Sequence, residues 1–261
     1  MSVSESAIGT LGLRTLGLVD HLGRIALFLG DVVRAAILPP YRFRRLVEEV
    51  FDVGVLSLAI VCLSGTTVGG VLALQGYYNL ARFGAEGSLG AVVGLSMIRE
   101  LGPVLTALLV AGRAGSAMAA GIASMVQTNQ IDGLRMMSVD PIDFVVRPKA
   151  VAMLIAMPLL NALFIVFAVF GGYLVGVLLL GLDGGTYVTS LESAINFTDD
   201  VAQTLLKSVI FGALVGAIAT YRGYISEPTS AGVSAATTGT VVTASVSVLL
   251  ADYAITAIWG V

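Results

Sequence analysis

The chain has 261 residues and a formal net charge of −3, with 57% hydrophobic residues, only 12% charged residues and a mean hydropathy of +0.95. Soluble domains carry about 25% charged residues, so this composition excludes an ordinary soluble enzyme or nucleic-acid-binding domain and indicates an all-α polytopic membrane protein. The single cysteine, Cys62, and the single histidine, His21, exclude an intrachain disulfide and a zinc site built on these two residue types.

The N-terminal segment, residues 1–50, precedes the membrane-spanning part and contains a predicted amphipathic helix at residues 8–38. At about 100° per residue, most of its apolar side chains share one arc and its charged side chains share another. Leu27 and Phe28 depart from this pattern. Six charged or titratable residues within 21 positions disfavour a sixth span, so we expect a helix that lies in the membrane interface.

The remaining residues, 51–261, are expected to form the membrane domain, because five stretches there are long enough to cross a bilayer core, which takes about 20 helical residues. These stretches are residues 53–81, 87–131, 150–182, 201–221 and 236–260. The second stretch exceeds one membrane thickness at about 1.5 Å per residue, so we expect it to tilt, protrude or break near Gly102–Pro103. Small residues at four-residue spacing, such as Gly65 and Gly69, predict close helix contacts.

The distribution of basic residues predicts the orientation of the chain. They are concentrated before the first span and in the loops that follow the second and fourth spans. The basic residues of these segments are Arg14, Arg24, Arg34, Arg42, Arg44, Arg45, Arg135, Arg147, Lys149 and Arg222. Residues 182–200 contain four carboxylates and no Lys or Arg. By the positive-inside rule the N-terminus and these two loops are cytoplasmic.

Two charged residues, Arg99 and Glu100, stand side by side within the second apolar stretch. Ionisable residues at membrane depth usually face a bundle interior or a water-filled cavity and mark a substrate path. A guanidinium there suits a phosphate, because its planar fork donates parallel hydrogen bonds. Adjacent helical residues do not pair with each other, so Glu100 needs a separate donor, for which Arg113 is a candidate. An interhelical salt bridge that only fixes packing is the alternative.

The loop after the second span contains a short predicted helix at about residues 127–139. The sequence of residues 125–141, which includes this helix, is MVQTNQIDGLRMMSVDP. Ile131, Leu134 and Met137 recur at helical spacing on one face, with Met136 beside them. An apolar, methionine-bearing face on the cytoplasmic side suits docking into the groove of a partner protein. A helix that lies on the bilayer surface is the alternative.

Several chemistries have no sequence support. The chain contains no G-x-x-x-x-G-K-[ST] motif and no H-E-x-x-H motif, so we expect neither nucleotide binding through a P-loop nor a zinc-peptidase site. Serine residues in the spans lack a histidine base. We therefore expect the chain itself to be no enzyme and to hold no cofactor or metal, an intramembrane lipid enzyme being the alternative.

Four stretches of the sequence resemble the MlaE permease family, and the resemblance extends over nearly the whole chain, about residues 10–260. They read SGTTVGGVLALQGY, LSMIRELGPVLTALLVAGRAGSAMAA, MSVDP and EPTSAGVSAATTGTVV. The resemblance implies the membrane subunit of an ABC transporter that moves phospholipids between the inner and outer membranes and maintains outer-membrane lipid asymmetry. It further implies a homodimer in the bacterial inner membrane, a cytoplasmic ATPase that binds ATP and Mg, a STAS-domain protein and a periplasmic hexamer of MCE-domain proteins.

The resemblance also implies site residues. A lipid pocket at the dimer interface would be lined by Leu72, Gln75, Tyr78, Leu80, Phe83, Arg99 and Glu100. Arg99 would lie near the phosphate, and Glu100 would support its surroundings. The helix at 127–139 would couple to the ATPase through Gln130, Ile131, Leu134, Met136 and Met137. An ATP-independent scramblase or a secondary transporter is the alternative function, and the two readings differ in whether this helix binds an ATPase.

Overall fold

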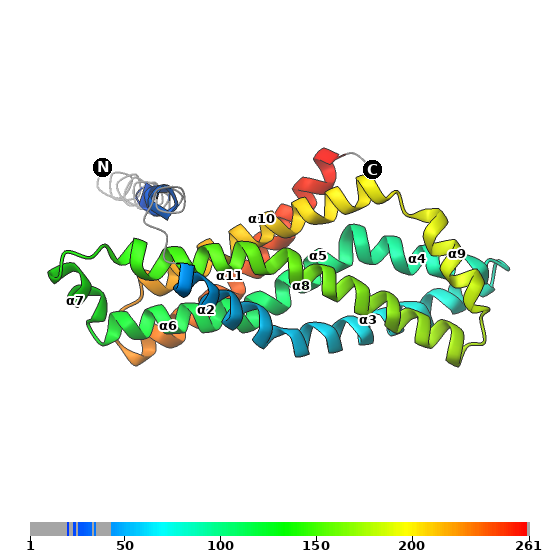
Figure 1. Cartoon of the computed structure of the whole chain (residues 1–261), viewed down its shortest axis with the longest axis horizontal. Helices are drawn as coiled ribbons and strands as arrows, with labels where there is room; N and C mark the ends of the chain where they lie inside the picture. The colour runs from blue at the N-terminus through cyan, green and yellow to red at the C-terminus, as the bar shows by residue number, and fades with distance from the viewer. Residues whose placement is uncertain (1–19, 21–22, 25, 33, 35–42, 260–261) are drawn as a thin grey trace, which may run out of the picture.

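The computed structural model describes residues 20, 23–24, 26–32, 34 and 43–259, and within these residues it contains helices and no strand (Figure 1). The elements are α2 (Phe43–Gly54), η1 (Val55–Ser57), α3 (Leu58–Ala81), η2 (Glu86–Ser88), α4 (Leu89–Ser96), η3 (Met97–Leu101), α5 (Gly102–Val110), η4 (Ala111–Gly115), α6 (Ser116–Gln127), α7 (Gln130–Met136), η5 (Ile142–Val146), α8 (Arg147–Tyr173), η6 (Leu174–Leu179), α9 (Gly184–Ala194), α10 (Phe197–Tyr224) and α11 (Ser230–Trp259).

Five segments of the described chain are long and apolar enough to cross a membrane, which confirms the predicted all-α membrane fold. They are Phe43–Ala81, Glu86–Gln127, Ile142–Leu179, Thr198–Tyr224 and Ser230–Trp259. The first and third segments begin about ten residues earlier than their apolar stretches, because amphipathic α2 continues into α3 and η5 continues into α8. We therefore treat the chain as a multi-pass membrane protein.

The second span does not break at Gly102–Pro103, although a break there is one of the alternatives expected for its excess length. It continues through two π-helical turns, η3 and η4, and Pro103 lies at the start of α5, where a missing N–H is tolerated. A π-helical turn holds one extra residue and often occurs at functional sites. η3 contains Arg99 and Glu100, and η4 contains Arg113.

The tightest helix contact joins α3 to α8, as the small-residue spacing predicts. A Cβ atom added at Gly69 would lie 1.8 Å from the carbonyl oxygen of Ala168, and one added at Gly171 would lie 2.0 Å from that of Thr66. The two backbones touch here because neither glycine has a side chain. α8 also packs against α10, and α6 and α10 pack against each other and against α11, so the second and fourth spans are the most buried of the five.

The segment between the third and fourth spans contains a helix, α9, which the sequence patterns do not predict. The side chain of Asp183 caps it by accepting a hydrogen bond from the backbone N–H of Thr186 at 2.8 Å. Tyr187 is buried against α4 and donates its hydroxyl to the Val169 carbonyl at 3.3 Å. Burial raises the pKa of Tyr187 to about 12, so the phenol stays protonated as a donor.

The predicted interfacial helix at 8–38 lies largely outside the described residues. Its described positions, residues 20, 23–24, 26–32 and 34, are helical. Phe28 and Val32 are buried against Val146 and Tyr221, with the rings of Phe28 and Tyr221 5.3 Å apart. Phe28, which departs from the amphipathic pattern, is thus a residue that holds this helix on η5 and the end of α10.

The elongated molecule has two chemically different ends (Figure 1). α7, which contains Arg135, and the described part of the N-terminal helix lie at one end. α9 and the connection from α3 to α4 lie at the opposite end. The predicted coupling helix and the acidic segment that contains α9, residues 182–200, therefore lie at opposite ends of the bundle.

Candidate functional site

A buried ion cluster joins the second, fourth and fifth spans. The side chain of Lys207 on α10 is fully buried, and its ammonium lies 2.7 Å from Glu100 Oε2 and 2.9 Å from Asp252 Oδ1. It also donates to the Arg99 carbonyl at 2.9 Å and to Thr256 Oγ1 at 2.9 Å. A buried ammonium needs such partners to offset the loss of hydration. The cluster therefore fixes three spans to one another.

Arg99 has its own partner, Asp200, at the start of α10. Its Nε atom donates to Asp200 Oδ1 at 2.7 Å, and the Asp200 side chain is buried. Asp200 Oδ2 accepts from the backbone N–H of Asn196 at 2.9 Å. The Arg99 side chain nevertheless stays 45% exposed, because it lines a pocket of about 320 Å³. The rest of its guanidinium can therefore bind a further anion.

The expectation that Glu100 could pair with Arg113 is wrong. Glu100 pairs with Lys207, whereas Arg113 donates to the Asp52 carbonyl at 2.5 Å and to Ser57 Oγ at 3.2 Å. Arg113 thereby links η4 to the junction of α2 and α3. The expectation that Arg99 and Glu100 have separate partners is confirmed.

Sequence reasoning did not assign Lys207, Asp200, Asp252 and Thr256 to this site. For the three charged residues the sequence does contain an indication. Lys207 and Asp252 lie within apolar stretches, and Asp200 lies at the edge of one. Charges at membrane depth must be paired, so these were candidates to pair with Arg99 and Glu100. Thr256 carries no such signal, because a threonine in a span usually bonds to its own helix backbone.

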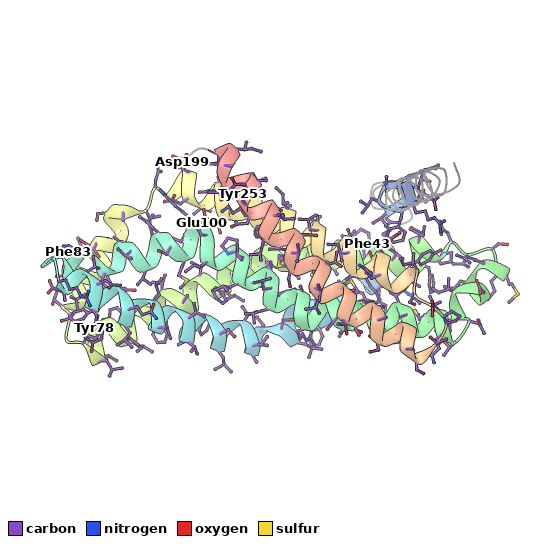
Figure 2. All side chains as sticks on the ribbon, turned by 180° about the vertical axis from the view of Figure 1, so that it is seen from behind. Phe43, Tyr78, Phe83, Glu100, Asp199 and Tyr253 are labelled. Atoms are coloured by element: carbon purple, nitrogen blue, oxygen red, sulfur yellow. The ribbon has the colours of Figure 1, made fainter. Side chains whose placement is uncertain are left out.

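The residues predicted to line the lipid pocket fall into two groups. Arg99 and Glu100 are one group, and the remaining residues lie towards the end of α3 or just after it. Leu72 and Leu80 pack partly against the core, whereas Gln75, Tyr78 and Phe83 are exposed, with 85% of Phe83 accessible. Figure 2 shows Tyr78 and Phe83 at one end of the molecule, with Glu100 nearer its middle. Within one chain, Tyr78 and Phe83 therefore lie apart from Glu100.

The predicted coupling helix is present as α7, between two residues with left-handed backbones, Asn129 and Ser138. The structure divides its apolar residues between two sides. Ile131 is buried and Leu134 packs partly against the core. Two methionines project outward, 83% of Met136 and 67% of Met137 being exposed, and Gln130 at the start of the helix is also exposed.

Arg135 connects α7 to the end of α10. Its guanidinium donates to the Tyr224 hydroxyl at 2.8 Å and to Asp132 Oδ1 at 2.9 Å. The hydrogen bond to the Tyr224 hydroxyl raises the pKa of Arg135 above its usual range, so the guanidinium stays charged. Arg135 therefore links α7 to the end of the span that carries Lys207 and Asp200.

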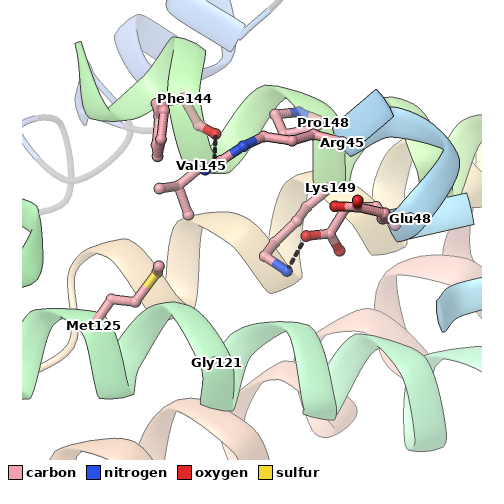
Figure 3. Close-up of a pocket in the computed structure, with 9 residues that line it drawn as sticks. Arg45, Glu48, Gly121, Met125, Phe144, Val145, Pro148 and Lys149 are labelled. Carbon is pink, nitrogen blue, oxygen red and sulfur yellow. Dashed lines mark hydrogen bonds and ion pairs between the residues drawn. The ribbon is translucent and has the colours of Figure 1, made fainter. Parts of the chain in front are cut away.

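A polar pocket of about 280 Å³ lies where α2 meets the start of α8 (Figure 3). The Arg45 guanidinium lies 3.6 Å from the centre of the Phe144 ring and donates to the Phe144 carbonyl at 3.4 Å. Lys149 pairs with Glu49 at 2.6 Å (Figure 3). These contacts join α2 to η5 and α8.

The chain matches known membrane permeases along nearly its whole length. The family described as Permease MlaE matches residues 46–258. The intermembrane phospholipid transport system permease protein MlaE of Haemophilus influenzae is 44% identical over 251 residues, which cover 96% of each chain. A probable ABC transporter permease protein of Rickettsia bellii is 40% identical over 95% of each chain.

A chloroplast protein also resembles the chain. The protein TRIGALACTOSYLDIACYLGLYCEROL 1 of Arabidopsis thaliana is 30% identical over 88% of this chain and 65% of its own length. With five apolar spans, a match over residues 46–258 and relatives aligned end to end, this chain belongs to the MlaE permease family.

Proposed function

We propose that this chain is the membrane subunit of an ABC transporter that moves phospholipids between the inner and outer membranes and so maintains outer-membrane lipid asymmetry. The observation that carries the proposal is the 44% identity, over 96% of both chains, to a permease of an intermembrane phospholipid transport system. The five apolar spans agree with such a role, because a lipid substrate must be moved within or out of a bilayer.

The proposed lipid site combines the two groups of residues that one chain holds apart. Exposed residues near the end of α3, Tyr78 and Phe83 among them, would contact acyl chains, and Arg99 would bind the phosphate. In a homodimer, residues of one copy can lie beside those of the other. The exposed aromatic side chains at the end of α3 support such an assembly, since large exposed apolar groups usually contact lipid or protein.

The energy would come from ATP and Mg bound by a separate cytoplasmic ATPase. Met136 and Met137 on α7 would dock in a groove of that ATPase, because methionine adapts to apolar surfaces. We further propose the bacterial inner membrane as the location, with the N-terminus cytoplasmic, a STAS-domain protein bound to the ATPase and a periplasmic MCE-domain hexamer. The basic residues at the α7 end, such as Arg45 and Arg135, support this orientation.

The proposal is tested by reconstituting the full chain with its ATPase in vesicles that contain fluorescent phospholipid. We expect lipid movement that requires ATP and stops when Met136→Asp and Met137→Asp are combined, with loss of ATPase copurification. Leu179→Asp is the matched control, because Leu179 is 77% exposed and lies at the far end of the third span. Equal lipid movement without nucleotide or ATPase would establish the scramblase alternative instead.

A further inference from the structure

The pocket beside Arg99 has an excess of negative charge. It is lined by Arg99, Glu100, Asp199, Asp200, Gln203, Thr256 and Trp259. Lys207 adjoins it through its ion pair with Glu100, and Asp252 adjoins it through its ion pair with Lys207. Four carboxylates therefore share this region with two cations, and a ligand that brings only a phosphate would add a further negative charge.

Asp199 is the carboxylate that accounts for this excess. Glu100 and Asp252 contact Lys207, and Asp200 contacts Arg99. Asp199 is exposed and has no ion pair among residues 43–259; its Oδ2 accepts only a neutral hydrogen bond from Asn196 Nδ2, at 2.7 Å. A carboxylate placed in this way attracts a cationic group of a ligand.

Trp259 adds a second element that favours a cation. Its side chain is 45% exposed at the end of α11 and lines the same pocket as Asp199. The negative face of an indole ring attracts ammonium groups, and tryptophan is the best of the aromatic residues for this contact. Arg99 is equally exposed and provides the complementary cation. One pocket thus offers a site for an anion and a site for an ammonium.

We infer that this pocket recognises the headgroup of a zwitterionic phospholipid, with the phosphate at Arg99 and the ammonium against Asp199 and Trp259. The inference rests on the proposed function and names the class of headgroup. Ethanolamine and choline headgroups carry both charges, whereas a glycerol headgroup carries only the phosphate. A pocket of about 320 Å³ is within the usual size range of small-molecule sites.

The test measures headgroup preference separately from lipid binding. Detergent-purified full-length chain is incubated with an equimolar mixture of phosphatidylethanolamine and phosphatidylglycerol with identical acyl chains, and native mass spectrometry counts the bound lipids. We expect an excess of phosphatidylethanolamine of roughly threefold to thirtyfold, the range for one cation–π contact plus one exposed ion pair. Phosphatidylcholine in place of phosphatidylethanolamine should show a similar excess.

Asp199→Asn and Trp259→Leu should each reduce this excess toward one while the total number of bound lipids is retained. Glu192→Gln is the matched control, because it removes one exposed carboxylate from α9, outside the pocket lining. Equal binding of the two lipids by the unaltered chain would overturn the inference, and so would an unchanged excess in both pocket variants. Absence of any bound phospholipid would instead contradict the proposed function.

Discussion

Lys207 on α10 donates to Glu100 on η3 at 2.7 Å from a position with no exposed side-chain surface. The same ammonium contacts Asp252 on α11. Three of the five spans therefore meet at one positive charge, and the packing of the bundle depends on that charge being compensated in place.

Removing this charge should destabilise the protein. Lys207→Met leaves Glu100 and Asp252 without their cation, so we expect the free energy of unfolding to fall by roughly 3 kcal/mol. The measurement is the thermal unfolding midpoint in detergent. Adding Glu100→Gln and Asp252→Asn to Lys207→Met should recover part of the loss, because the unpaired carboxylates are then neutral. An unaltered midpoint for Lys207→Met alone would show that water compensates the carboxylates.

Arg99 provides the test of the phosphate site. Arg99→Ala should reduce copurifying phospholipid about tenfold, since a charge-assisted hydrogen bond contributes about 1.5–3 kcal/mol. Arg99→Lys should retain an intermediate amount, because an ammonium cannot form the two parallel bonds of a guanidinium. Lipid is quantified by mass spectrometry of the purified complex. Normal lipid content in both variants would mean that Arg99 only fixes the position of Asp200.

The contact between Arg135 and Tyr224 should affect coupling more than assembly. Tyr224→Phe removes the hydroxyl that accepts from Arg135 at 2.8 Å. We expect lipid-stimulated ATP hydrolysis to fall about two- to tenfold, the equivalent of one hydrogen bond, with the ATPase still bound. Tyr253→Phe on the exposed face of α11 is the control for loss of a tyrosine hydroxyl. Unchanged stimulation in Tyr224→Phe would assign the coupling to other contacts of α7.

The α3–α8 contact should tolerate no side chain. Gly69→Ala places a Cβ atom 1.8 Å from the Ala168 carbonyl oxygen, and we expect a loss of about 3 kcal/mol or more in unfolding free energy. Gly121→Ala is the matched control, because a Cβ atom at this helical position has no neighbour within 4 Å. It should be neutral or stabilise by about 0.4–1 kcal/mol. Equal midpoints for the two variants would disprove backbone contact at Gly69.

The cap of α9 should give a pH dependence in the acid range. Hydrogen bonds from Thr186 hold the pKa of Asp183 below its usual range. The stabilisation is therefore complete above the unfolded pKa of about 4 and is lost as the pH falls through the lower folded value. Hydrogen exchange of the α9 amides, taken relative to the intrinsic exchange rate at each pH, should accelerate in that range. Asp183→Asn, which keeps an acceptor but does not titrate, should remove the acceleration. If the exchange of this variant still accelerates at acid pH, another group titrates.

The spans were predictable from sequence because hydrophobicity is a local property, and a long uncharged run specifies a membrane helix by itself. The partner of Glu100 was not predictable in the same way. It depends on how α10 is rotated against η3, which brings Lys207 from 107 residues away. Phe28 shows the same limit, because its role follows from contact with Tyr221 and not from the amphipathic pattern of its own helix.

The sequence patterns predict no helix in residues 182–200, the acidic segment after the third span. α9 forms there through the Asp183 cap and the burial of Tyr187 against α4, a tertiary contact. The two lipid-site groups illustrate a further limit. Family resemblance places Tyr78 and Arg99 in one pocket, whereas a single chain separates the end of α3 from η3, and the proposed second copy would bring such groups together.

The touching backbones at Gly69 and Gly171 also determine which parts of the protein can move. With carbonyl groups and α-carbons in direct contact, the first and third spans cannot slide or rotate against each other without a steric clash. In the proposed transport cycle they would therefore move as one unit. Bending would then fall to the second span, where η3 and η4 each add an extra residue.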